Sequence, residues 1–284
     1  MSTLRTLLVL GRVSNLPTVW SNCLAGWWVG GGGKVERLPC LLAGASFLYL
    51  GGMFLNDAFD VGFDRQYRRE RPIPSGAIGS GAVWGWGVAW LALGAASLFW
   101  LGKSTGALGL GLAVCILLYD ARHKQITLAP LLLGLCRLFL YIIAASTALN
   151  GVTGWSLWCG LALAAWVVGL SCLARRESAP GALRRWPLSL LVAPVFLAMV
   201  MNANDFRQKA MLLSVVLGLW AVRCLRPTLW TAQPEVGRTV AGLLAGIVFV
   251  DWLAVGPGAP RELSLAFLGL FAASLVLQRY VPAT

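Results

Sequence analysis

The stretch LPCLLAGASFLYLGGMFLN, residues 38–56, runs directly into DAFDVGFDRQYRRERPIPSG, residues 57–76. The first segment carries no charged side chain, and roughly 20 apolar residues are enough for an α-helix to cross a lipid bilayer. The second segment changes at once to carboxylates and then to arginines. This junction predicts a membrane-spanning helix that ends at a charged membrane surface.

The whole chain has the composition of a membrane protein. Of its 284 residues, 58% are hydrophobic and 12% are charged, and the mean hydropathy is +0.74. About a quarter of the residues of a soluble domain are charged, so a soluble fold is excluded. The net charge of +12 then indicates loops facing anionic membrane lipid, and we expect no nucleic-acid partner. The seven cysteines are scattered without a CxxC pair, which favours buried thiols over disulfides or zinc ligands.

Charge-free runs divide the chain into nine or ten expected spans in a single domain, 1–284. The clear runs are 13–33, 38–56, the apolar part of 72–102 from about Gly81, 104–119, two spans within 125–174 that part at Asn150-Gly151, and 186–204. The last third is weaker: 210–222 needs its flanking basic residues to snorkel, 239–250 stops before Asp251, and 263–278 closes the chain. We therefore predict an all-α integral membrane bundle.

The distribution of basic residues predicts the orientation. With a cytoplasmic N-terminus, alternate loops place 15 basic residues inside and 6 outside, while Arg137 lies within a span and Arg279 is terminal. The positive-inside rule favours this arrangement, which we expect in a bacterial-type inner (plasma) membrane. The acidic cluster and three basic loops then share the cytoplasmic face.

Four polar side chains of the junction fall on one helical stripe. At about 100° per residue, Asp57, Asp60 and Asp64 lie within a ~60° arc, and Asn56 extends the same stripe. Like charges on one stripe repel each other unless a cation neutralises them. Oxygen-only ligands suit Mg²⁺, which also takes phosphate oxygens. Arginine forks such as Arg68 and Arg71 would bind those phosphates. The alternative is a solvated turn whose acids are balanced by arginines, but this stripe holds three of only 11 acidic residues.

The pattern N-D-x-x-D-x-x-x-D followed by R-P-I-P-S-G resembles the first aspartate-rich motif of the UbiA superfamily of membrane prenyltransferases. Arg12-x-x-Asn15 is similar to the start of that family's first span, and Tyr119 to Lys124 is similar to its tyrosine-and-lysine element. The resemblance implies a bundle of about nine transmembrane helices around a central cavity. It also implies Mg²⁺-dependent ionisation of a prenyl diphosphate and transfer of the isoprenyl group to an aromatic or other lipophilic acceptor.

The resemblance assigns roles to individual residues. The implied metal ligands are Asn56, Asp57, Asp60, Asp64 and Glu177. The implied diphosphate-binding residues are Arg12, Asn15, Arg68, Arg71, Arg122, His123, Arg175 and Arg176. The implied catalytic residues are Lys124, which would hold the leaving group, Tyr119, whose ring would stabilise a carbocation, and Asp120, as a further metal ligand or an acceptor base.

The second acidic motif of the family is reduced in this chain. Residues 171–178 read SCLARRES, with Glu177 as the single acid, so Arg175 and Arg176 would replace metal charge. This variant resembles the EboC branch of UbiA-like proteins. It leaves open an alternative function, a non-catalytic isoprenoid-binding or transport component. Arg137, alone in its apolar run, would either face the cavity or form a structural pair.

Overall fold

A computed structural model describes residues 3–175, 186–201, 205–231, 233–256 and 258–283, and all regular secondary structure in these ranges is helical. The N-terminal part contains α1 (Thr3–Leu10), η1 (Val13–Asn15), α2 (Leu16–Val29), η2 (Val35–Arg37), α3 (Leu38–Phe59), α4 (Val61–Tyr67), α5 (Ser80–Leu101), α6 (Lys103–Arg122) and α7 (Ala129–Ser146). The C-terminal part contains α8 (Gly154–Ala174), η4 (Trp186–Val192), α9 (Ala193–Met201), α10 (Asp205–Leu229), α11 (Val236–Ala245), α12 (Ile247–Val255) and α13 (Arg261–Gln278).

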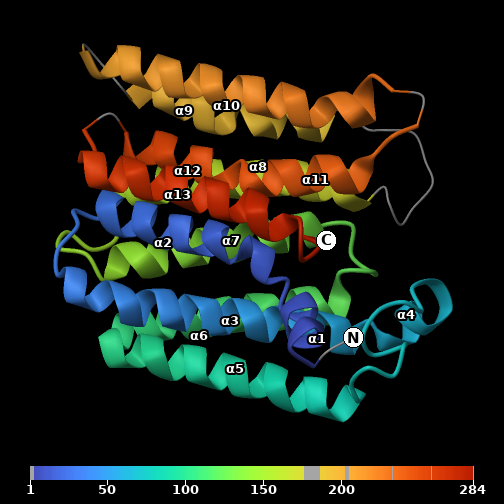
Figure 1. The fold of residues 1–284 in the computed structure, drawn as a ribbon. Coiled ribbons are helices and arrows are strands. Elements are labelled where there is room, and N and C mark those ends of the chain that lie inside the picture. The colour runs from blue at the N-terminus through green and yellow to red at the C-terminus, as the bar shows by residue number, and fades with distance from the viewer. Residues whose placement is uncertain (1–2, 176–185, 202–204, 232, 257, 284) are drawn as a thin grey trace.

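Eight helical segments of the described chain are long and apolar enough to cross a membrane. They are 35–59, 80–101, 103–122, 129–146, 154–174, 208–229, 236–255 and 261–278. The shorter α2 and the apolar segment Trp186–Met201 lie alongside them in the bundle (Figure 1). The prediction of a multi-pass bundle with nine to ten helical spans is confirmed.

The helices lie side by side in the bundle (Figure 1). The helix α5 forms one edge and packs on α3, whereas α9 and α10 form the opposite edge. Between them, α2 packs on α7, and α7 packs on α6 and α8. Both termini and α4 gather at the same end of the bundle.

The last third differs from the sequence-based expectation in one span. The run expected to stop at Val250 continues through α12 to Val255, with a junction at Gly246. Asp251 therefore lies inside the span, where its side chain is fully buried. A charged residue in lipid is costly, so the sequence predicts that the span ends before Asp251. In the structure the protein interior surrounds this side chain.

Close packing of α2 on α7 depends on a glycine. A Cβ at Gly26 would collide with the carbonyl oxygen of Tyr141 and lie 2.9 Å from the Cβ of Ala144. Small residues allow helix backbones to approach each other in membranes. This contact holds together the two helices that carry Asn22 and Arg137.

Candidate active site

A cavity of about 870 Å³ runs into the bundle from the end that carries α4. Helices α2, α3, α6, α7, α8 and α11 contribute to its wall. Along α3, the lining residues extend from Asn56 back to Ala45, which is roughly 16 Å of helix. We call the polar end the mouth, formed by Arg12, Asn56, Asp57, Asp60, Asp120 and His123. We call the apolar interior the chamber, formed by Val19, Leu112, Leu133, Leu140, Val167 and Leu244.

The acidic stripe lies across a junction between two helices. The helix α3 ends at Phe59, Asp60 stands between the helices, and α4 begins at Val61. Helical spacing continues across the junction, because Asp60 N donates to Asn56 O and Asp64 N donates to Asp60 O. All four stripe side chains are buried. Asn56, Asp57 and Asp60 line the cavity, whereas Asp64 does not.

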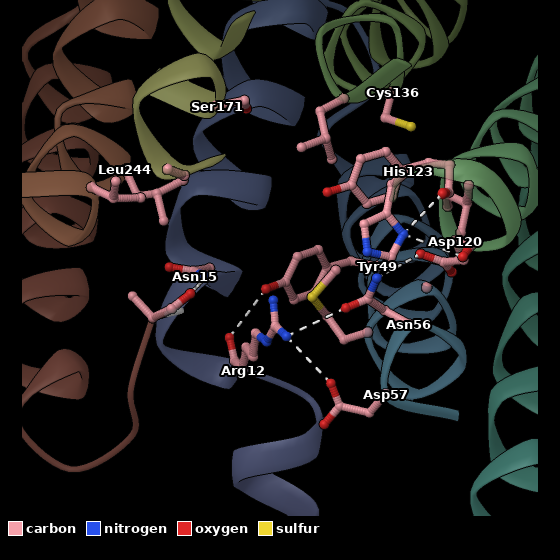
Figure 2. Close-up of a pocket in the computed structure, with 18 of the residues that line it drawn as sticks. Arg12, Asn15, Tyr49, Asn56, Asp57, Asp120, His123, Cys136, Ser171 and Leu244 are labelled. Atoms are coloured by element: carbon pink, nitrogen blue, oxygen red, sulfur yellow. Dashed lines mark hydrogen bonds and ion pairs between the residues drawn. The ribbon is translucent and has the colours of Figure 1, made fainter. Parts of the chain in front are cut away.

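Two arginines from distant segments neutralise this stripe. Arg12 Nη2 lies 3.3 Å from Asp57 Oδ1 and 3.4 Å from Asn56 Oδ1, as Figure 2 shows. Arg71 Nη1 lies 2.9 Å from Asp57 Oδ1 and 3.5 Å from Asp64 Oδ2. Arg12 adopts a left-handed backbone conformation with φ 41°. A non-glycine residue in that region is uncommon and often functional.

Asp60 is held by two cationic side chains that follow α6. Lys124 Nζ lies 2.6 Å from Asp60 Oδ1, and His123 Nε2 lies 3.5 Å from Asp60 Oδ2. Burial raises the pKa of Asp60, but the hydrogen bonds and charges of His123 and Lys124 outweigh burial and bring this pKa below its ordinary value. Burial lowers the pKa of His123, yet Asp60 outweighs it and brings that pKa above its ordinary value.

Asp120 and Tyr119 complete the mouth from the end of α6. Asn56 Nδ2 donates to Asp120 Oδ1 at 3.1 Å, which links α3 to α6. Asp120 Oδ2 is buried and has no hydrogen-bond partner among the described residues. The ring of Tyr119 stacks on His123 with centroids 5.0 Å apart, and Tyr119 lines the cavity.

The remaining predicted residues fall into three groups. Arg68 and Arg175 line the cavity, and Arg175 also donates to the carbonyls of residues 123, 126 and 127 in the α6–α7 loop. Asn15 lines the cavity too, but its Nδ2 donates to Ala283 O at 2.9 Å. Arg122 is exposed and does not line the cavity. Arg176 and Glu177 lie outside the described residues.

Several lining residues gave no signal in the sequence. Tyr49 on α3 donates its hydroxyl to Arg12 O at 3.2 Å. Arg5 on α1 and Pro282 and Ala283 beyond α13 also line the cavity. Their roles depend on contacts between distant parts of the chain, which no local pattern reveals. By contrast, Asp251 had a usable signal, because an acid that ends an unusually short apolar run is a candidate for burial inside it.

The oxygens of the mouth fit a magnesium ion that is shared with a phosphate ligand. Within the described residues, no three His, Cys, Asp or Glu side chains form a ready metal cage. Mg²⁺ does not need one, because it is usually held by one or two carboxylates together with substrate phosphates and water. Asp120 Oδ2 at the mouth is buried without a hydrogen-bond partner in the described chain, and so is Asp64 Oδ1, which does not line the cavity; both retain acceptor capacity. This all-oxygen donor set suits Mg²⁺ and does not suit zinc.

Carboxylates and cations at the mouth of an apolar chamber indicate a class of protein. It is a multi-pass membrane protein whose cavity suits a ligand with an anionic head and an apolar tail. The model of the UbiA prenyltransferase family matches residues 15–281, nearly the whole chain, and the chain belongs to this family.

Relatives and solved structures agree with this membership. Digeranylgeranylglyceryl phosphate synthase of Ignicoccus hospitalis is 32% identical over 157 residues, which are 55% of this chain and 50% of that protein. The synthase of Methanothrix thermoacetophila is 34% identical over 127 residues, 44% of this chain and 47% of that protein. The matched segments thus span about half the length of these relatives.

The fold is shared with solved structures. A UbiA homolog from Aeropyrum pernix aligns with a TM-score of 0.66 at 18% identity, over 86% of this chain and 97% of that chain. A homolog from Archaeoglobus fulgidus bound to DMAPP and Mg²⁺ aligns with a TM-score of 0.57 at 14% identity, over 96% and 98% of the two chains. The UbiA-type bundle expected from the sequence is confirmed.

Proposed function

We propose that this protein is a membrane prenyltransferase, which transfers an isoprenyl group from a prenyl diphosphate to a lipophilic acceptor with Mg²⁺ as cofactor. The observation that carries the proposal is the junction of two environments in one cavity. Carboxylates and cationic side chains meet at the mouth, and an apolar chamber continues from it. A prenyl diphosphate has the same division between an anionic head and a hydrocarbon tail.

Three cationic side chains in and beside the mouth are placed to hold the diphosphate. Arg12, Arg71 and Lys124 are now bound to Asp57 and Asp60. Those carboxylates would hold Mg²⁺, which would supply positive charge to the phosphate oxygens. The N–H groups of the same three side chains would donate to the leaving diphosphate, and charge-assisted hydrogen bonds of this kind stabilise a developing anion.

The chemical step breaks the bond between C1 of the prenyl group and the bridging oxygen. The electron pair leaves with the diphosphate, a nucleophilic atom of the acceptor bonds to the allylic carbon, and the acceptor loses a proton. The ring of Tyr119 faces the cavity and would stabilise positive charge on the allyl group. Asp120 Oδ2, which lacks a hydrogen-bond partner in the described chain, could accept the proton or serve as a further oxygen ligand.

The relatives support the choice of acceptors to test. Their name describes a product with two geranylgeranyl groups on a glyceryl phosphate, so an acceptor with one such group is the first lipid to test. Structures of the Archaeoglobus fulgidus homolog contain DMAPP or GPP together with Mg²⁺, which supports the choice of donor. Aromatic phenols form the second acceptor class of the proposal. We also propose that the mouth faces the cytoplasm.

The test is diphosphate release by purified protein in lipid nanodiscs. Wild type would receive Mg²⁺, geranyl diphosphate and either geranylgeranylglyceryl phosphate or a phenol. We expect release that is lost with EDTA and falls about 100-fold or more in Asp60→Asn and Lys124→Met. Glu36→Gln, an exposed acid at the opposite end of α3, is the matched control and should behave as wild type. If wild type binds the donor but releases no diphosphate with any acceptor, the protein is instead an isoprenoid carrier.

A further inference from the structure

A second polar site lies inside the chamber, away from the mouth. Arg137 lines the cavity from the middle of α7, about 12 Å along the helix from Ala129. Its immediate neighbours on the cavity wall are Cys136, Leu133 and Leu140. A guanidinium at this depth stays charged, and burying that charge costs free energy. The groups that contact Arg137 therefore indicate its role.

No carboxylate contacts Arg137 directly among the described residues. Arg137 Nη1 donates to Asn22 Oδ1 at 2.6 Å and to Thr18 O at 3.3 Å, and Nη2 donates to Thr18 Oγ1 at 3.1 Å. The nearest acid described in this region, Asp251, contacts Asn22 and does not contact Arg137 itself. Asn22 Nδ2 donates to Asp251 Oδ2 at 2.6 Å, and Ser21 Oγ donates to the same oxygen. Asn22 therefore separates the guanidinium from the carboxylate.

This arrangement leaves part of the arginine available. Thr18, Asn22 and Asp251 have no exposed surface, whereas the Arg137 side chain remains partly accessible. A guanidinium has five N–H donors, and three of those of Arg137 are used by the contacts above. The Nε–H and one Nη2–H have no partner within the described part of the chain, and adjacent donors of this kind match two oxygens of one anionic group.

Resting on the proposed function, we propose that Arg137 is a specificity-determining residue that binds a carboxylate or phosphate carried by the acceptor. The donor has its own cations at the mouth, and beyond its diphosphate it is hydrocarbon, which offers a guanidinium nothing to bind. The acceptor is the remaining substrate that must enter the chamber. Asn22 and Thr18 hold the guanidinium of Arg137, Asp251 holds Asn22, and Arg137 lines the cavity. The acceptors selected would be lipid-soluble molecules with an anionic group.

The experiment is a binding measurement with matched pairs of probes. One pair is geranylgeranylglyceryl phosphate and uncharged geranylgeranylglycerol, and the other is 4-hydroxybenzoate and phenol. In wild-type nanodiscs, we expect the anionic member of at least one pair to bind about 10- to 100-fold more tightly than its match. Arg137→Gln should abolish this preference, while affinity for geranyl diphosphate with Mg²⁺ stays within about twofold. Equal binding of both members by wild type, or a preference that survives Arg137→Gln, overturns the proposal.

Two further variants separate recognition from structure. If Arg137 only balances Asp251, removing both charges in Asp251→Asn/Arg137→Gln would restore wild-type binding of the anionic probe. Under our proposal the double variant folds but still lacks the preference. Arg137→Lys keeps the charge without the fork, so it should fold even if the glutamine variants do not, and it should reduce the preference about tenfold or more. Full preference in the lysine variant contradicts bidentate binding. Donor binding and diphosphate release, measured separately, report on the proposed function itself.

Discussion

Arg71 occupies the oxygens that a metal ion would need. Its Nη1 atom contacts both Asp57 and Asp64, whose side chains are nearly fully buried. A divalent cation and this guanidinium therefore compete for the same carboxylates. The same guanidinium is also a phosphate ligand of the proposed complex, so removing it should affect metal and donor in opposite directions.

We expect Arg71→Met to bind Mg²⁺ alone more tightly than wild type and geranyl diphosphate about tenfold or more weakly. Without metal, the variant should lose about 1–3 kcal/mol of stability, because the buried Asp64 loses its ion pair and Asp57 keeps only Arg12. Thermal unfolding over a Mg²⁺ titration, and over a geranyl diphosphate titration at fixed Mg²⁺, measures these effects. Arg69→Met, an exposed arginine of the same loop, is the control and should leave all three values unchanged. Weaker binding of Mg²⁺ by Arg71→Met would contradict the competition.

His123 makes metal-free stability depend on pH. Its pKa lies above its ordinary value of about 6.5, because Asp60 outweighs burial. A histidine with a raised folded-state pKa stabilises the protein fully below its unfolded pKa, and this contribution is lost as pH rises through the folded value. In EDTA, wild type should therefore lose more thermal stability between pH 6 and pH 8.5 than His123→Gln. Identical losses would mean that the ion pair contributes nothing.

The contact between α2 and α7 sets the position of the chamber wall. Gly26 leaves no room for a Cβ against Tyr141 and Ala144, whereas Gly218 on α10 has open space around its Cα. Gly26→Ala should lower the free energy of unfolding by about 1–3 kcal/mol, because the helices must move apart. Gly218→Ala should raise it by about 0.4–1 kcal/mol through its higher helix propensity. Equal effects of the two substitutions in a chemical unfolding assay would exclude the close approach.

At the scale of helices, the sequence predicts features that depend on neighbouring residues. The spans follow from runs of apolar residues, and the stripe from Asn56 to Asp64 follows from the helical period. That period persists through the junction at Asp60 because the backbone hydrogen bonds continue across it. The helical period no longer predicts the direction of a side chain once the helix has ended. Arg122 is the last residue of α6 and is exposed, whereas Lys124, two residues beyond the helix, contacts Asp60.

Contacts between distant elements could not be predicted. The amide of Asn15 donates to a carbonyl 268 residues further along the chain, so no motif around Asn15 indicates it. Asp251 joins Ser21 and Asn22 across 230 and 229 residues. Sequence reasoning could flag Arg137 as an unusual charge, but its separation from Asp251 by an amide depends on how α2, α7 and α12 pack together.

At the scale of the whole molecule, the charged groups are separated along the bundle. The residues of the mouth and the arginines of segment 65–71 lie at one end of the bundle. At the other end, Lys34 precedes the start of α3 and Lys103 follows the end of α5. If the protein takes its diphosphate from the cytoplasm, as we propose, its mouth must open to that side. The excess of basic loop residues at this end predicts the same orientation.

Substituted cysteines can test this orientation directly. Arg69 and Lys103 are both exposed; Arg69 lies in the segment before α5 and Lys103 directly after it, so a cysteine at each reports one face. The background would replace the four partly accessible native cysteines, 40, 115, 136 and 172, with alanine. An impermeant maleimide should label Arg69→Cys only in inside-out vesicles and Lys103→Cys only in right-side-out vesicles. The reverse labelling pattern would place the mouth on the outer face. The cytoplasm could not then supply the prenyl diphosphate, and the proposed source of the donor would be wrong even if the site binds it.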